Sequence, residues 1–302
     1  EKKDVRVDLF NQWEILPKDC NILHFFSVMP GSLVVLDYIK KTINIPIVIS
    51  PNFWIDVEGW KNSGTYEEIK TILWLVDRII VNSDIEKEVL YNNANDFIYY
   101  DNIEVVHNMY NDLFLNYVDE ELFRTEYNIN EKFILNVANV EPRKNQLEFL
   151  KALRDFPEYK FITLGGIRDL EYFKACKEVA GDQFIQINRI DNFDPLLRSA
   201  YSGCEFFAMP SLIETPSISA LEAAVSGSKI LITECGSTKE YFKNFVEYID
   251  PYDINGMKTS IKNIINQDKN KLLSEHITFN YSSEKIMIEL INVYTNVLKK
   301  EG

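Results

Sequence analysis

The sequence predicts an α/β protein with two doubly wound domains, each a parallel sheet flanked by helices. A length of 302 residues exceeds what one hydrophobic core usually organises, so two domains are expected. Short β-rich runs alternate with helical patterns along most of the chain, which is typical of parallel sheets wrapped by helices. Hydrophobic residues at 46% and charged residues at 26% are ordinary for a globular protein.

The alternation is most complete between residues 133 and 233. Its apolar runs lack polar alternation, which predicts strands buried on both faces, as in a parallel sheet. The predicted strands are FILNVA (133–138), KFITL (160–164), QFIQI (183–187), EFFAM (205–209) and KILIT (229–233), and the helical patterns between them cover 146–156, 169–180, 195–201 and 217–226.

The first part of the chain repeats this pattern less fully. Strands are predicted near residues 5–10, 21–26, 45–49, 78–81 and 103–107. Ser83 and Glu86 are spaced as a capping box that opens a helix through Leu90, so a strand-to-helix turn is expected at Asn82.

The polar, acidic stretch 116–132 separates the two patterns. We therefore predict an N-terminal domain over residues 1–128 and a C-terminal domain over 129–302, which ends in an amphipathic helix at 283–299. Ligands bind at the carboxyl ends of the strands in open α/β sheets, so the expected site is a cleft that these edges face.

Composition excludes several classes of function. A net charge of −14 opposes extended binding to nucleic acid. The sequence also contains no run of 18 apolar residues, which is the length that a membrane-spanning helix requires. The four cysteines form no C-x-x-C pair and have no His-rich neighbourhood, so we expect reduced thiols, a cytoplasmic location and no metal. The charged start without an initiator methionine suggests that the native sequence begins earlier.

Two glutamates follow the predicted strand 205–209 and carry the first chemical signal. With Thr215 as cap and Pro216 in the first turn, Glu214 is expected in the loop and Glu222 two turns into the helix. The helix start at Pro216, Ser217 and Ile218 would bind a diphosphate through its positive dipole end and through the free amides that follow Pro216, while the carboxylates would accept hydrogen bonds from sugar and ribose hydroxyls.

A purely structural interpretation of the same stretch also exists. Ser219 and Glu222 match a capping box, and carboxylates are common near helix starts for dipole reasons alone.

The second signal is the basic pair Arg143 and Lys144, between the strand at 133–138 and the next helix. This position places both cations at the same sheet edge as Glu214, where they could hold a diphosphate. The alternative is a solvated basic pair at a helix start.

The stretch from Glu214 to Glu222 resembles the E-x(7)-E signature of retaining glycosyltransferases with the GT-B fold, specifically the group 1 family. Residues 134–146 (ILNVANVEPRKNQ) are similar to that family's strand, loop and basic pair. The resemblance covers 131–300 well and 5–110 more loosely. It implies that Glu214 contacts the donor sugar, Glu222 the nucleotide ribose, and Arg143 with Lys144 the diphosphate.

The chain also departs from the family. The family's first strand and glycine-bearing loop have no counterpart before Val5, so the first domain is expected to lack its initial βαβ portion. Where many members carry a histidine near the reacting centre, this chain has Asn52, which cannot titrate. We predict that Asn52, Trp54 and Asn82 lie on the acceptor side, with Trp54 either stacking on a sugar or simply packing.

The resemblance implies transfer of a hexosyl group, with retention, from a nucleoside diphosphate sugar to a glycan or lipid-linked glycan acceptor in surface polysaccharide biosynthesis. We expect neither a cofactor nor a metal, and we expect no nucleic acid partner. Contact with the membrane is expected to be at most peripheral, at its inner face. The alternative is a catalytically weak or inactive nucleotide-sugar-binding scaffold of the same fold, to which the departure at Asn52 points. A two-domain carbohydrate receptor is a third hypothesis. The sequence makes no prediction of oligomeric state.

Overall fold

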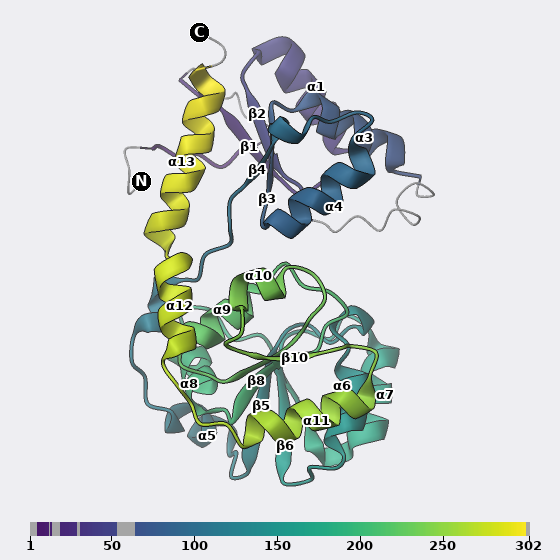
Figure 1. The fold of residues 1–302 in the computed structure, drawn as a ribbon, viewed down its shortest axis with the longest axis vertical. Helices are drawn as coiled ribbons and strands as arrows, with labels where there is room; N and C mark the ends of the chain where they lie inside the picture. Colours follow the sequence, from purple (N-terminus) through teal and green to yellow (C-terminus); the bar gives the residue numbers. More distant parts are fainter. Residues whose placement is uncertain (1–4, 12, 14–18, 29–30, 53–63, 300–302) are drawn as a thin grey trace. The chain divides into compact units, whose positions relative to one another are not determined.

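The structure is a computed structural model that describes residues 5–11, 13, 19–28, 31–52 and 64–299 (Figure 1). The chain forms two compact units: unit 1 comprises Glu1–Val106 with Ile288–Gly302, and unit 2 comprises His107–Met287. The prediction divided the chain after residue 128 and kept the whole C-terminal helix in the second domain. The structure differs at both points.

The boundary lies nearer the N-terminus than predicted because the segment that includes residues 121–127 packs within unit 2. Helix α5 (Glu121–Tyr127) packs on α8 (Pro195–Gly203) of unit 2, with Phe123 fully buried and its amide donating to Ser199 Oγ at 2.9 Å. The C-terminal helix α13 (Ser283–Lys299) begins in unit 2, but Tyr294 near its end donates or accepts a 2.6 Å hydrogen bond with His24 Nδ1 of unit 1.

Within its described residues, unit 1 contains a four-stranded parallel sheet in the order β1-β2-β3-β4. Its core consists of apolar side chains from these strands and from the helices against them, among them Leu36, Ile49, Ile72 and Val81. The elements are β1 (Leu23–Phe26), α1 (Ser32–Tyr38), the π-helix η1 (Ile39–Ile43), β2 (Ile47–Ser50), α3 (Tyr66–Leu75), β3 (Arg78–Val81), α4 (Asp84–Ala94), the 3-10 turn η2 (Tyr100–Asn102) and β4 (Ile103–Val105).

Four of the five strands predicted in the first part of the chain are therefore confirmed. The prediction of a strand at residues 5–10 is wrong, because this segment has no regular secondary structure. Val7 and Leu9 are 70% and 95% exposed, so their apolar side chains find no sheet or core to pack against.

The capping box at the start of α4 is confirmed. Ser83 Oγ accepts the amide hydrogen of Glu86 at 2.9 Å, and the Glu86 carboxylate accepts the Asn82 amide hydrogen at 2.6 Å. These two bonds fix the turn that follows β3.

Unit 2 contains a six-stranded parallel sheet in the order β10-β9-β8-β5-β6-β7. The five predicted strands are confirmed, and β10 is added at one edge. The elements are α5, β5 (Lys132–Val137), η4 (Pro142–Lys144), α6 (Gln146–Leu153), β6 (Tyr159–Leu164), α7 (Leu170–Ala180), η5 (Gly181–Gln183), β7 (Phe184–Ile187), α8, β8 (Phe206–Met209), α9 (Ile218–Val225), β9 (Ile230–Thr233), α10 (Thr238–Phe242), β10 (Glu247–Ile249), α11 (Ile254–Ile265) and α12 (Leu272–Asn280), preceded by the turn η3 (Asp112–Leu115).

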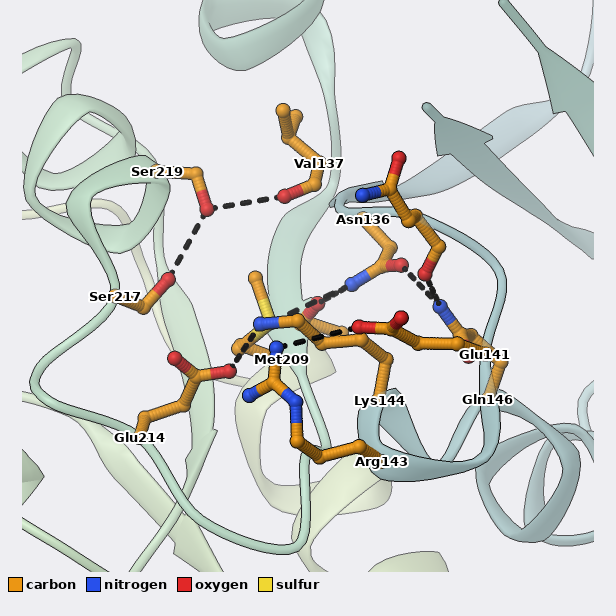
Figure 2. A network of polar contacts seen from close by, with 12 residues as sticks. Asn136, Val137, Glu141, Arg143, Lys144, Gln146, Met209, Glu214, Ser217 and Ser219 are labelled. Carbon is orange, nitrogen blue, oxygen red and sulfur yellow. Dashed lines mark hydrogen bonds and ion pairs between the residues drawn. The ribbon is translucent and has the colours of Figure 1, made fainter. Parts of the chain in front are cut away.

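The strand order of unit 2 reverses between β5 and β8. From β5 the chain proceeds outward through β6 and β7, and it then returns to place β8 on the other side of β5. Loops that follow two such strands diverge to opposite faces of the sheet and leave a crevice at its carboxyl edge. Buried Asn136 reinforces this pair, since its Nδ2 donates to Ala208 O at 2.8 Å (Figure 2).

Among the described residues, no helix combines the length and the apolar character needed to cross a membrane.

Gly165, directly after β6, lies so close to the preceding loop that a Cβ there would sit 2.1 Å from Ala138 O. Both partners are backbone, so Gly165→Ala should lower the free energy of unfolding by about 2 kcal/mol or more, in the range of an overpacked core. Urea unfolding measures the loss. The control is Gly166→Ala, whose Cβ would meet Asn139 Oδ1 at an ordinary 3.5 Å. Equal losses in the two variants would contradict this explanation.

Candidate functional site

The loop after β5 brings the predicted basic pair to the carboxyl edge of the unit 2 sheet. Arg143 and Lys144 lie in the short turn η4, which ends at Asn145 with a left-handed backbone (φ 57°). The Asn145 side chain donates to Pro251 O at 2.8 Å and so anchors the turn to the segment after β10. Arg143 and Lys144 therefore lie between β5 and α6, at the sheet edge where the sequence predicted them.

The loop after β8 holds Glu214 by its backbone. The Glu214 amide donates to Cys235 O at 3.3 Å, and the Glu214 carbonyl accepts from the Ser237 amide at 2.9 Å. Gly236 between them has φ 93°, and a Cβ there would lie 2.1 Å from Glu214 O, so this close approach requires glycine. Glu214 is therefore clamped by the turn after β9.

The two loops meet in an ion pair. Lys144 Nζ lies 2.5 Å from Glu214 Oε1, and the two side chains point toward each other in Figure 2. A second contact, from the Leu212 amide to Arg143 O at 3.0 Å, ties the backbones together. The side chains are only 13% and 7% exposed, so each charge depends on the other for compensation. An ammonium has three N–H donors, which leaves Lys144 able to bind an additional anion.

Arg143 has a different environment from Lys144. Its side chain is 54% exposed and donates to Glu141 Oε1 at 3.2 Å. The other oxygen of Glu141 lies 3.4 Å from Arg168 Nη1, in the turn after β6. Glu141 thus holds two arginines at this edge of the sheet, and their side chains are 54% and 65% exposed.

Helix α9 begins later than predicted. Ser217 has φ 82°, which no right-handed helix accommodates, so the first helical residue is Ile218. Thr215 as cap and Pro216 in the first turn are therefore wrong, and Pro216 and Ser217 belong to the loop. Glu222 is the fifth residue of the helix, about one turn in rather than two.

The capping-box alternative for this helix is also wrong. Ser219 lies inside the helix, and its hydroxyl donates to Val137 O at 3.1 Å and contacts Ser217 Oγ at 3.0 Å (Figure 2). These bonds join the start of α9 to the end of β5. Glu222 has another partner.

Glu222 is a buried carboxyl, 5% exposed. Removal from water raises its pKa to about 7, and a hydrogen bond from Tyr201 Oη to Oε2 at 3.2 Å acts in the opposite direction. Tyr201 is fully buried and its own pKa is raised, first by burial and then by Glu222, so it remains a donor. The two glutamates therefore have different partners. Glu214 is paired with the Lys144 ammonium, and Glu222 is paired with the neutral phenol of Tyr201.

Two predicted acceptor-side residues come together in unit 1. Asn52 and Asn82 follow the adjacent strands β2 and β3, and Asn82 Nδ2 donates to Asn52 Oδ1 at 3.4 Å. Asn52 is exposed, with a left-handed backbone (φ 51°). Trp54 lies outside the described residues.

Sequence reasoning missed Glu141, Arg168 and Tyr201. Glu141 directly precedes the basic pair, so its role as a partner could have been suggested by charge alone. Tyr201 gives no such signal, because an aromatic residue on an amphipathic helix is normally read as core. Only the packing of α8 against α9 reveals its contact with Glu222.

Solved structures share this fold. Sucrose-phosphate synthase from Thermosynechococcus elongatus superposes with a TM-score of 0.76 at 18% identity, covering 93% of this chain and 74% of that one. Anabaena HepE in complex with UDP and glucose gives 0.76 at 13% identity, covering 92% and 79%. A UDP-forming trehalose-phosphate synthase from Burkholderia xenovorans gives 0.74 at 11% identity, covering 94% and 74%.

No curated protein matches the sequence. The family model described as glycosyl transferases group 1 matches residues 118–278, more than half of the chain, and this range contains the whole loop and helix system around Lys144, Glu214 and Glu222. The chain belongs to the group 1 glycosyl transferases.

Proposed function

We propose that this glycosyltransferase moves a hexosyl group from a UDP-sugar to a glycan or lipid-linked glycan acceptor, with retention of configuration and without a metal. The observation that carries the proposal is the Lys144–Glu214 pair at the reversal point of the unit 2 sheet, beside Arg143 and the start of α9. The UDP complex of HepE and the UDP-forming trehalose-phosphate synthase, which share the fold, support a uridine donor.

The positive groups are suited to the donor's diphosphate. Arg143 and Lys144 lie at the carboxyl edge of the sheet, and the amides of Ile218 and Ser219 at the start of α9 have no intrahelical acceptor. Charge that develops on the departing diphosphate would be stabilised by these donors, which is the contribution otherwise made by a metal ion. Arg168, held by Glu141, is a third cation within the same sheet edge.

The carboxylates are suited to hydroxyls. Glu214, held by its ion pair with Lys144, would accept a hydrogen bond from the donor sugar, and Glu222 would accept one from the ribose. Retention is proposed from the family, with the leaving phosphate assisting removal of the acceptor proton, because Asn52 cannot act as a base.

The acceptor and the setting are also proposals. Surface polysaccharide biosynthesis in the cytoplasm, at or near the inner face of the membrane, agrees with four cysteines that are all free thiols. A nucleotide-sugar-binding scaffold without turnover is the competing function, and the first experiment separates the two.

When the chain is incubated with a panel of UDP-sugars, with or without acceptor, it should release UDP from at least one of them. This release should continue in the presence of EDTA, because no metal ion is required. Glu214→Gln should bind UDP nearly normally in titration calorimetry, yet turn over about 10²- to 10³-fold more slowly, as when one transition-state contact is removed. Binding without turnover in the parent would favour the scaffold. Activity that EDTA abolishes and magnesium restores would contradict metal independence.

Removal of the cations should weaken UDP binding. Arg143→Ala should cost about 10- to 100-fold in affinity with unchanged stability, because the guanidinium is half exposed. Lys144→Ala should lose affinity and stability together, since it strands the buried Glu214 carboxylate. The matched control is Lys144→Met combined with Glu214→Gln, which should regain stability but not affinity. Unchanged affinity in both single variants would remove the diphosphate assignment.

Glu222 should make UDP binding depend on pH. Its pKa of about 7 means that the carboxylate forms as pH rises through 7, so affinity should increase across this range. Glu222→Gln should remove the part of the dependence that Glu222 causes, and the dependence that remains in this variant measures titration of the nucleotide itself. Tyr201→Phe should move the midpoint upward, because the hydrogen bond from Tyr201 lowers the Glu222 pKa. A midpoint that stays in place would contradict the assignment.

Stability provides the matching test without ligand. An ordinary carboxyl has a pKa of 4.5, so between 4.5 and about 7 the folded state holds more protons at Glu222 than the unfolded state. The free energy of unfolding therefore falls as pH rises through this window, and the fall should be smaller in Glu222→Gln.

A further inference from the structure

Unit 1 carries a groove that lies between the outer face of α3 and the segment that leads from α4 into β4 (helices labelled in Figure 1). Its volume is about 430 Å³, within the range of small-molecule sites. The groove is formed by a helix face and a helix-to-strand connection. Asn52 and Asn82, by contrast, lie in strand-to-helix turns at the carboxyl edge, so neither belongs to the groove.

Two large aromatic side chains line the groove while remaining mostly in water. Trp74 on α3 is 71% exposed and Tyr99 before β4 is 78% exposed. Both rings have an apolar face and a polar edge, which suits ligands that are apolar on one face and hydroxylated at the rim. Pyranose rings have this character, because their axial C–H groups form an apolar face surrounded by hydroxyls.

Polar groups complete the lining. Asn95 and Asp96 are exposed beside the aromatic rings, and among the described residues neither side chain has a hydrogen bond or ion pair. A carboxamide and a carboxylate together offer both donors and acceptors, as a sugar hydroxyl requires.

The charge of the groove selects against phosphates. Its one lysine, Lys70, has its ammonium 5.1 Å from the centre of the Phe97 ring, so its charge is already partly engaged. Two carboxylates, Glu67 and Asp96, outnumber it within the lining. An anionic ligand such as a nucleotide, nucleic acid or acidic lipid headgroup would meet net repulsion.

We propose that this groove is a second carbohydrate site, which binds a neutral oligosaccharide by stacking on Trp74 and Tyr99. The contribution of this groove to catalysis rests on the proposed glycosyltransferase activity. If the groove binds an acceptor glycan at a point remote from its reacting end, the effective concentration of that end for transfer is raised. The binding itself does not depend on any donor or turnover.

The test is direct binding of the parent chain to an array of neutral oligosaccharides of four to six sugars, followed by calorimetric titration of the strongest binder. Trp74→Ala and Tyr99→Ala should each weaken binding about tenfold or more, as expected when an aromatic contact is removed. Trp74→Phe should retain most of the affinity. UDP affinity should stay at the parental value in all three variants.

Tyr38→Ala is the matched control, because Tyr38 is a 58% exposed aromatic residue of unit 1 outside the groove lining. It should bind the oligosaccharide like the parent. No binding of any neutral oligosaccharide by the parent, equal affinity in the groove variants, or preferential capture of anionic glycans would overturn the proposal. If the parent chain does not bind UDP, the proposed function is refuted, while the oligosaccharide result still stands.

Discussion

The arrangement of the site depends on the reversal of strand order between β5 and β8. Because these strands are neighbours, the loop that carries Lys144 and the loop that carries Glu214 emerge side by side at one sheet edge, although 70 residues separate them in the chain. The resulting ion pair, the bond from Leu212 to Arg143 O and the clamp at Gly236 fix the geometry before any ligand arrives. Such preorganisation lowers the reorganisation that binding and transfer would otherwise require.

The site treats its two carboxyls in opposite ways. Glu214 lies 2.5 Å from the Lys144 ammonium, whereas Glu222 lies in an apolar helix, where the Tyr201 hydroxyl is its one side-chain partner among the described residues. Burial therefore makes ionisation of Glu222 costly in the folded protein. Under the proposed function, the ribose hydroxyls of the nucleotide would supply hydrogen-bond donors to this carboxylate.

Unit 1 shows how a family position can change without loss of local order. Asn52 stands where the resemblance implies a histidine in many members, and its amide oxygen accepts a hydrogen bond from Asn82, which follows the next strand. The groove beside Trp74 and Tyr99 lies on other elements, so the two regions can be altered independently by mutation. Under the two proposals made above, binding of a glycan and chemistry at its end would occupy separate surfaces.

The sequence alone determined most of the elements and the family. Apolar runs predicted nine of the strands that the structure contains, the Ser83–Glu86 spacing predicted a cap, and the two glutamates with the basic pair indicated the candidate site, because these signals are local or depend on strand ends sharing an edge. It failed at residues 5–10, where a segment of apolar residues interrupted by Arg6 and Asp8 forms no strand, and at α9, where the backbone of Ser217 delays the start of the helix. Only the tertiary structure decided that Lys144 pairs with Glu214, that Tyr201 holds Glu222 and that Glu141 bridges two arginines. Those contacts depend on which strands become neighbours and how helices pack on them, and such long-range choices leave no periodic pattern in the chain.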